Sequence, residues 1–146
     1  MSLELELQLE VAEAGLPRPE QFRAWAEAAL AGRGGEAELV IRVVDAAESA
    51  GLNQRFRGKE GPTNVLSFPF RAPPAVRYDL LGDLVICAPV VASEAAEQGK
   101  PEVAHWAHLV VHGTLHLLGY DHQVQAEAED MEAREIRILQ TLGYAN

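Results

Sequence analysis

The stretch HGTLHLLGYDH, residues 112–122, places three histidines at intervals of four and six residues. Residues four apart lie on one face of a helix, so His112 and His116 should present their rings side by side. Gly119 can end that helix in a left-handed turn, which would bring His122 back toward the other two rings. The stretch therefore predicts a helix and a following turn that gather three imidazoles. Three protein ligands are typical of a catalytic zinc site, whose fourth position is left for water.

Few other residues are candidate ligands for this metal site. Cys87 is the only cysteine and lies far upstream, which disfavours a closed structural site with a sulfur ligand. Asp121 is expected to orient His122 as a hydrogen-bond partner. His105 and His108 fall on the same helical face, and because three ligands suffice we expect them to pack or to support the site. Histidines on an apolar helix can be ordinary core residues, but three of them at this spacing favour a metal.

The rest of the chain alternates between strand and helix periodicity. Leucines at positions 3, 5, 7 and 9 alternate with glutamate or glutamine, the pattern of a strand with one wet face. Further strands are expected at residues 39–44, 65–70 and 81–87, and helices from Pro19, from the 39–44 strand to Gly51, from Pro89 to about Gln98, from Pro101 and from about Ala126. This pattern predicts an α+β fold, a single domain over residues 1–146 with a mixed four-stranded β-sheet and helices packed on it.

Several apolar side chains are assigned to the core of this domain. Cys87 lies in an apolar strand and Met131 on the inner side of the last helix, so both are expected to be buried. Phe68 and Phe70 are expected to pack inward from a strand, although they and Phe56 could also stack on bases, as aromatic side chains do in proteins that bind single-stranded nucleic acid. A content of 48% apolar residues in 146 suits one core of this size.

The charge of the chain is unevenly distributed. A net charge of −10 disfavours polyanionic partners in general. Between Asn53 and Tyr78, however, five cations (Arg55, Arg57, Lys59, Arg71 and Arg77) accompany the single anion Glu60, a balance of +4 that leaves −14 elsewhere. Most basic runs of this kind are simply solvated loops. If this one folds beside the histidines, it would place a positive field for phosphate next to the metal. The acidic run 127–135 is expected to form the solvated face of the last helix.

The histidine spacing also fits the metzincin protease pattern H-E-x-x-H-x-x-G-x-x-H at every position but one. Gly113 stands where those proteases have the glutamate that passes a proton to the leaving amine. This substitution weakens a peptidase interpretation without excluding hydrolysis. Zinc lowers the pKa of bound water to about 7, so a phosphodiester, which needs less help from a protein acid, would be a suitable substrate.

Three segments resemble the YbeY endoribonucleases, bacterial RNA hydrolases specific for single strands that act in ribosomal RNA maturation and ribosome quality control. They are AHLVVHGTLHLLGYDH at 107–122, LNQRFRGKEGPTNVLSFPF at 52–70 and LGDLVI at 81–86. The resemblance runs from about residue 39 to the C-terminus. It implies a single zinc ion per chain held by His112, His116 and His122, and a functional arginine at Arg57.

We therefore interpret the chain as a zinc-dependent endoribonuclease. Its expected substrate is single-stranded RNA in ribosomal RNA precursors or ribosomal subunits, with no DNA or membrane partner. Arg57 is the predicted catalytic residue, which would stabilise charge on the phosphate oxygens, and Arg55 and Lys59 are candidate substrate-binding residues. No residue is an obvious general base. A single cysteine and the absence of a spanning apolar run or a leader suggest the cytoplasm.

Two alternatives from other classes stay open at this point. A zinc metallopeptidase would use the same three ligands, and Gly113 counts against it. A non-catalytic protein that binds RNA or the ribosome would keep zinc as a structural element, and the lack of an obvious fourth ligand counts against that.

Overall fold

The β-sheet has four strands in the order β1, β2, β4, β3 in the computed structural model, which describes residues 2–70, 79–120 and 125–144. The strands are β1 (Ser2–Leu9), β2 (Glu36–Val44), β3 (Val65–Pro69) and β4 (Leu80–Cys87). β1, β2 and β4 run parallel, and β3 pairs antiparallel with β4 at one edge. The predicted mixed four-stranded sheet is confirmed. Arg71 and Arg77 of the basic run lie outside the described residues, as do Asp121 and His122.

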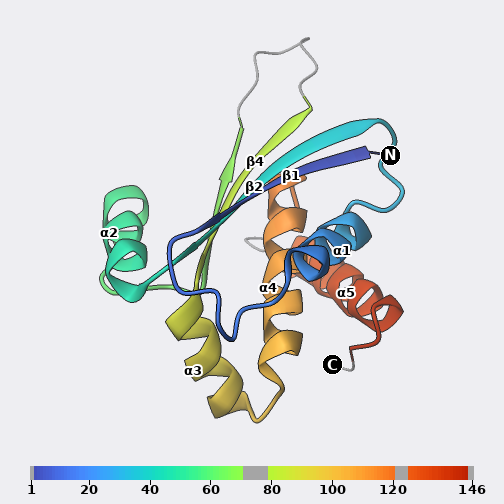
Figure 1. Cartoon of the computed structure of the whole chain (residues 1–146). Coiled ribbons are helices and arrows are strands. Elements are labelled where there is room, and N and C mark those ends of the chain that lie inside the picture. Colours follow the sequence, from blue (N-terminus) through green and yellow to red (C-terminus); the bar gives the residue numbers. More distant parts are fainter. Residues whose placement is uncertain (1, 71–78, 121–124, 145–146) are drawn as a thin grey trace.

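Five helices accompany the sheet in the described part of the chain: α1 (Pro19–Ala29), α2 (Ala46–Arg57), α3 (Ala88–Gln98), α4 (Glu102–Leu117) and α5 (Gln125–Thr141). Figure 1 shows α1, α4 and α5 grouped on one side of the sheet and α2 on the other. Prolines at the expected starts of α1, α3 and α4 pre-set the backbone angle of a first turn. The α+β prediction is therefore correct in element type and order.

The predicted end of α2 was wrong, because the helix continues past Gly51 to Arg57. A glycine in a helix interior costs only about 1 kcal/mol, which the capped start and the packing of the helix can offset. The helix ends instead at Gly58, whose φ of 66° is the left-handed conformation of a helix end. The extension places Arg55, Phe56 and Arg57 on the last helical turn.

The main core lies between the sheet and α1, α4 and α5, and α4 runs through its middle. Trp106 of α4 is 1% exposed and meets Phe22 of α1 edge to face, with ring centroids 5.7 Å apart. Leu84 and Ile86 of β4 face this core, and Met131 of α5 is buried in it as predicted. The helix that carries the histidines is therefore held on three sides.

A second, smaller core lies on the other face of the sheet, under α2. Val85 and Cys87 of β4 alternate with the residues that face α4, and they pack with Leu66 of β3 and with Leu52 of α2. Cys87 is buried as predicted. Phe68 joins this cluster only partly, and Phe70 is 42% exposed, so the prediction that Phe70 packs inward was wrong.

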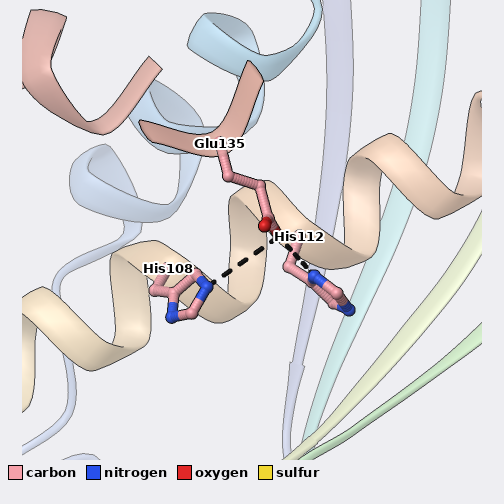
Figure 2. A group of neighbouring side chains, drawn as sticks. All are labelled: His108, His112 and Glu135. Carbon is pink, nitrogen blue, oxygen red and sulfur yellow. Dashed lines mark hydrogen bonds and ion pairs between the residues drawn. The ribbon is translucent and has the colours of Figure 1, made fainter. Parts of the chain in front are cut away.

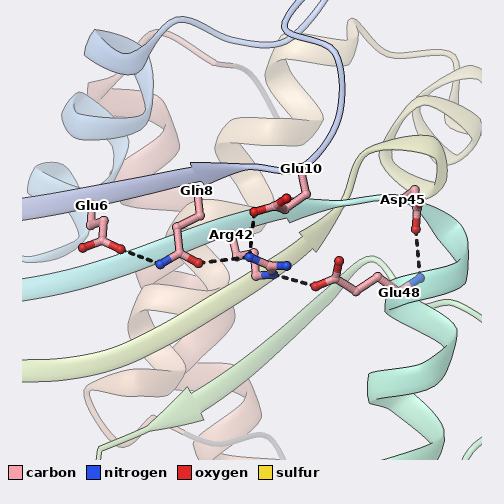
Figure 3. Close-up of polar contacts among 6 residues, drawn as sticks. All are labelled: Glu6, Gln8, Glu10, Arg42, Asp45 and Glu48. Atoms are coloured by element: carbon pink, nitrogen blue, oxygen red, sulfur yellow. Dashed lines mark hydrogen bonds and ion pairs between the residues drawn. The ribbon is translucent and has the colours of Figure 1, made fainter.

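The start of α2 is rich in paired charges (Figure 3). Asp45 caps the helix by accepting a hydrogen bond from the backbone N–H of Glu48. Arg42 of β2 forms ion pairs with Glu10, at 2.9 Å, and with Glu48, at 2.5 Å. It also donates to Gln8, whose amide in turn contacts Glu6. This end of the helix is thus tied to β1 and β2.

Across the three described ranges, none of the helices combines the length and the apolar character that crossing a bilayer requires.

Candidate metal centre and adjoining basic surface

Helix α4 brings two of the three predicted ligands together. His112 and His116 lie one turn apart and are both half-buried. Their Nε2 atoms are 3.1 Å apart, and the ring planes are inclined by 75°. The helix ends just after them, and Gly119 takes a φ of 102°, the left-handed turn that the sequence predicts. The third predicted ligand, His122, lies outside the described residues.

The separation of these two nitrogens is suited to a shared metal ion. Zinc binds imidazole nitrogen at about 2.0–2.1 Å with tetrahedral angles, so two nitrogens on one ion are about 3.3 Å apart. The 3.1 Å between the Nε2 atoms of His112 and His116 is close to this value. Without an ion, the same distance fits a hydrogen bond between the rings.

The other nitrogen of His112 contacts a carboxylate from α5. Glu135 is only 7% exposed, and its Oε1 lies at hydrogen-bonding distance from Nδ1 of His112. Figure 2 shows Glu135 reaching across from α5 to α4. When Nδ1 carries the proton and donates it to Glu135, Nε2 keeps its lone pair for a metal. A carboxylate behind a metal-binding histidine is a common arrangement that fixes both the tautomer and the ring orientation.

Sequence reasoning missed Glu135 because it belongs to the acidic run 127–135, which we expected to be solvated. The sequence does contain a sign that Glu135 faces inward, because it lies four residues after the buried Met131 and four before the buried Leu139. A helical residue between two such positions faces inward. A charged side chain there needs a partner, and His112 provides it.

A second group of side chains could also hold a metal. Nε2 of His108 lies 3.8 Å from Oε1 of Glu135, and one possible ligand atom from each of His108, His112 and Glu135 lies within 4.8 Å of the other two. Burial lowers the pKa of His108 below its ordinary value of 6.5, against the opposing effect of Glu135. The two groups share His112, whose Nε2 lies toward His116 and whose Nδ1 contacts Glu135. A metal in this second group would displace the hydrogen bond that orients His112.

His105 has a different set of contacts from the other histidines. It is 3% exposed, and its Nε2 lies 2.8 Å from Oε1 of Glu94 on α3. Glu94 also accepts a hydrogen bond from the side chain of Asn64, at 3.1 Å. Glu94 therefore links the start of β3 to the histidine helix. His105, His108, His112 and Glu135 all line one cavity of about 650 Å³ between α3, α4 and α5.

Gly113 is in contact with the sheet. A Cβ atom at this position would lie 2.8 Å from Cδ2 of Leu84 and 3.4 Å from Oγ of Ser67. The Ser67 hydroxyl donates a hydrogen bond to the carbonyl of Gly113, at 3.4 Å. Position 113 thus lets α4 approach β3 and β4 closely, and a glutamate side chain would not fit there without displacing Leu84.

The predicted basic residues lie at the far end of α2. Arg55, Arg57 and Lys59 are exposed, and within the described ranges none of them forms an ion pair. Because α2 and α4 cover opposite faces of the sheet, the structure does not bring Arg57 into contact with the histidines. Only the edge strand β3 separates the two sides there, with Ser67 against α4 and Phe68 against Phe56 of α2.

Comparisons with known proteins agree with one another. Residues 12–143 match the family described as "Endoribonuclease YbeY". A protein of that name from Methylococcus capsulatus is 62% identical over 144 residues, which cover 99% of this chain and 94% of the relative. Another from Alkalilimnicola ehrlichii is 61% identical over 150 residues, covering 99% and 90%. A solution structure of a Thermotoga maritima protein has the same fold, with a TM-score of 0.60 at 23% identity, and covers 94% of this chain and 91% of that one.

Proposed function

Because this chain belongs to the YbeY endoribonuclease family, we propose that it is a metal-dependent endoribonuclease that cleaves single-stranded RNA. The observation that carries the proposal is the identity of 62% with a curated endoribonuclease over nearly the whole of both chains. The paired Nε2 atoms of His112 and His116 add a chemical reason, since a hydrolase of this kind needs an activated water and these residues offer a metal site.

We propose zinc as the metal, one ion per chain, with His112, His116 and His122 as its ligands. The donor set fits, because imidazole nitrogen is a common zinc ligand and Nε2 of both described histidines faces one point. Bound zinc would supply Lewis acidity and a water that ionises near neutral pH. Glu135 holds the ring of His112 through Nδ1 and is engaged there, so we do not assign it the role of general base.

Arg57 is the proposed catalytic residue for the phosphate. Its guanidinium is exposed and free of ion pairs in the described structure, so it can make a two-pronged contact with phosphate oxygens. For Arg57 to act on the phosphate that is cleaved, the RNA would pass around the edge of β3 so that this phosphate lies between Arg57 and the histidines. Arg55 and Lys59 would bind neighbouring phosphates.

The finer identity of the substrate is proposed on the resemblance of the three sequence segments. We propose ribosomal RNA precursors or ribosomal subunits as the partners and the cytoplasm as the compartment. A single cysteine, buried as Cys87, is compatible with a reducing environment.

One preparation can test the proposal against its rivals. Metal content would be measured together with cleavage of single-stranded RNA, duplex RNA and an unstructured peptide. We expect about one zinc per chain and cleavage of single-stranded RNA alone. Zinc-dependent peptide cleavage that survives removal of trace proteases would favour a metallopeptidase. Stoichiometric zinc without any hydrolysis would favour a non-catalytic RNA-binding protein.

A further inference from the structure

Phe56 is the most exposed large apolar side chain in the described structure, with 57% of its surface open to solvent. It lies on the last turn of α2. Its ring meets the ring of Phe68 at 73°, with centroids 5.1 Å apart. The carbon at the centre of the Arg55 guanidinium is 5.4 Å from the centroid of the Phe56 ring. Phe56 is therefore supported from one side by a second aromatic ring, while more than half of it stays in contact with water.

The cations next to Phe56 in the sequence form no ion pairs with the residues that the structure describes. Arg55, Arg57 and Lys59 lie within three residues of it and have no carboxylate partner among the described side chains. Arg42, by contrast, forms ion pairs with two glutamates. Three cations that form no ion pair with the described residues can attract an anion, and one of them, Arg55, lies over the Phe56 ring.

The combination of an open ring with unpaired cations matches the chemistry of single-stranded RNA. Unpaired bases stack on aromatic side chains whatever their sequence, and the phosphates between them are bound by arginine and lysine. The bases of a duplex are paired and stacked on one another, so they cannot cover Phe56.

We propose that Phe56 and Arg55 form a binding site for one unpaired RNA base, next to the catalytic Arg57 and with Lys59 as a contact for an adjoining phosphate. The inference rests on the proposed function, because it describes how the same RNA substrate is held. The site lies beside the edge strand β3, where Phe68 faces α2 and Ser67 contacts Gly113 of α4. An RNA strand with one base stacked on Phe56 can continue around the edge of β3 toward the histidines.

The first test uses Phe56→Trp in metal-free protein, so that its outcome is independent of catalysis. The two natural tryptophans, Trp25 and Trp106, are 2% and 1% exposed and give a constant background. We expect oligoadenylate to quench the emission of the new tryptophan, and an abasic ribose-phosphate chain of equal length to leave it unchanged. Gln140→Trp, on the exposed face of α5, is the matched control and should not respond. Equal responses to the two chains would overturn base stacking in favour of simple phosphate binding.

The second test separates stacking from a structural role for Phe56. Phe56→Leu keeps an apolar cover over Phe68 but has no aromatic face. We expect Phe56→Leu and Phe56→Ala both to lose about tenfold in affinity for single-stranded RNA, a size typical of one stacked base, while binding of the abasic chain stays unchanged. Parental RNA affinity in Phe56→Leu would show that the ring is only a cover, and the inference would be withdrawn.

The two proposals fail in different ways. If the zinc-loaded parent protein cleaves no RNA while Phe56→Trp is still quenched by oligoadenylate, the base site stands and the proposed activity is wrong. If the parent cleaves RNA and Phe56→Leu binds and cleaves RNA like the parent, the activity stands and the base site is wrong.

Discussion

The histidine site and the basic end of α2 lie on opposite sides of β3 and differ in how their polar side chains are held. On α4, His112 contacts His116 through one nitrogen and Glu135 through the other. At the end of α2, Arg57 and its neighbouring cations have no such partner in the described chain. Hydrogen bonds to metal ligands fix their orientation before the ion binds. Side chains that bind a flexible polyanion can instead become ordered when the polyanion binds.

The charged start of α2 shows that this difference does not depend on residue type. Arg42 is an arginine next to the same helix, yet it is held by Glu10 and Glu48 and contributes to the structure. We therefore expect changes at the histidine site to alter metal binding, and changes at the basic end of α2 to alter RNA turnover without altering stability.

The largest effect is expected from His116→Ala. Two remaining imidazoles hold a divalent ion far more weakly than three, so bound zinc and RNA cleavage should be lost together. Metal analysis after gel filtration and a cleavage assay would measure both. His105→Ala is the control, and because His105 is paired with Glu94 it should keep stoichiometric zinc. Full zinc occupancy in His116→Ala would contradict the ligand assignment.

Arg57→Ala should lower RNA turnover by about 10²-fold, a size typical of removing one charge-stabilising donor. It should keep its zinc and melt near the parental temperature, because the exposed guanidinium makes no ion pair within the described part of the protein. Arg57→Lys should recover only part of the rate, since a point charge cannot reproduce a two-pronged contact.

Two other outcomes for Arg57→Ala would change its assignment. A loss seen only as weaker RNA binding, and reproduced by added salt, would place Arg57 with Arg55 and Lys59 as a phosphate contact. Unfolding of the variant would make Arg57 a structural residue and remove the contrast with the histidine site.

Glu135→Ala should weaken zinc binding by about 10- to 100-fold, as is typical when the partner of a metal-binding histidine is removed. Glu135→Gln should lose less, because its amide oxygen can still accept the hydrogen bond from His112. Chelator competition would measure the affinity, and nitrogen chemical shifts of His112 would report its tautomer. Glu132→Ala, an exposed glutamate on the same helix, is the control.

A variant at His108 distinguishes the two candidate groups of ligands. If the metal is bound through Nε2 of His112 and His116, His108→Ala should keep most of its zinc affinity. A loss as large as that in His116→Ala would favour the group of His108, His112 and Glu135.

The smallest effect is expected at Asp83, which lies on the α2 face of the sheet next to Phe68 in the register of β3 and β4. Burial and the neighbouring charge of Glu6 raise the pKa of Asp83 above its ordinary value of 3.8. When the pKa of a carboxyl is higher in the folded than in the unfolded state, the folded protein loses stability as the pH rises from the unfolded-state pKa through the folded-state pKa. Asp83→Asn should therefore stabilise the protein at pH 7 by at most about 0.5 kcal/mol.

The gain in Asp83→Asn should disappear below about pH 3.8, where the parental carboxyl is protonated in both the folded and unfolded states. Urea unfolding of the variant and the parent at both pH values would measure it. A variant less stable than the parent at pH 7 would mean that the Asp83 carboxylate has a favourable contact on this face.

The sequence predicted those features that depend on local pattern. The alternation of leucines in β1, the prolines that start three helices and the spacing of His112 and His116 each involve residues close together in the chain. The residue behind His112 could not be predicted in this way, because Glu135 is 23 residues away and is brought to it by the packing of α5 on α4. The extent of α2 was missed because Gly51 was given more weight than the helix end at Gly58.

The exposure of Phe70 could not be predicted from local pattern either. Its place in an apolar stretch suggested burial, but the burial of a residue at the end of an edge strand depends on which helix covers that edge. Here α2 reaches Phe68 and leaves Phe70 42% exposed.

The glycine at position 113 has a consequence for how this fold can diversify. Replacing one residue would complete the sequence pattern of a zinc peptidase, so the two activities look like near neighbours in sequence space. The close approach of α4 to Leu84 opposes that route, because a side chain at 113 must displace the end of the Leu84 side chain. A mutational path from one chemistry to the other therefore begins with a disturbed contact between α4 and the sheet, although the sequence patterns differ at a single position.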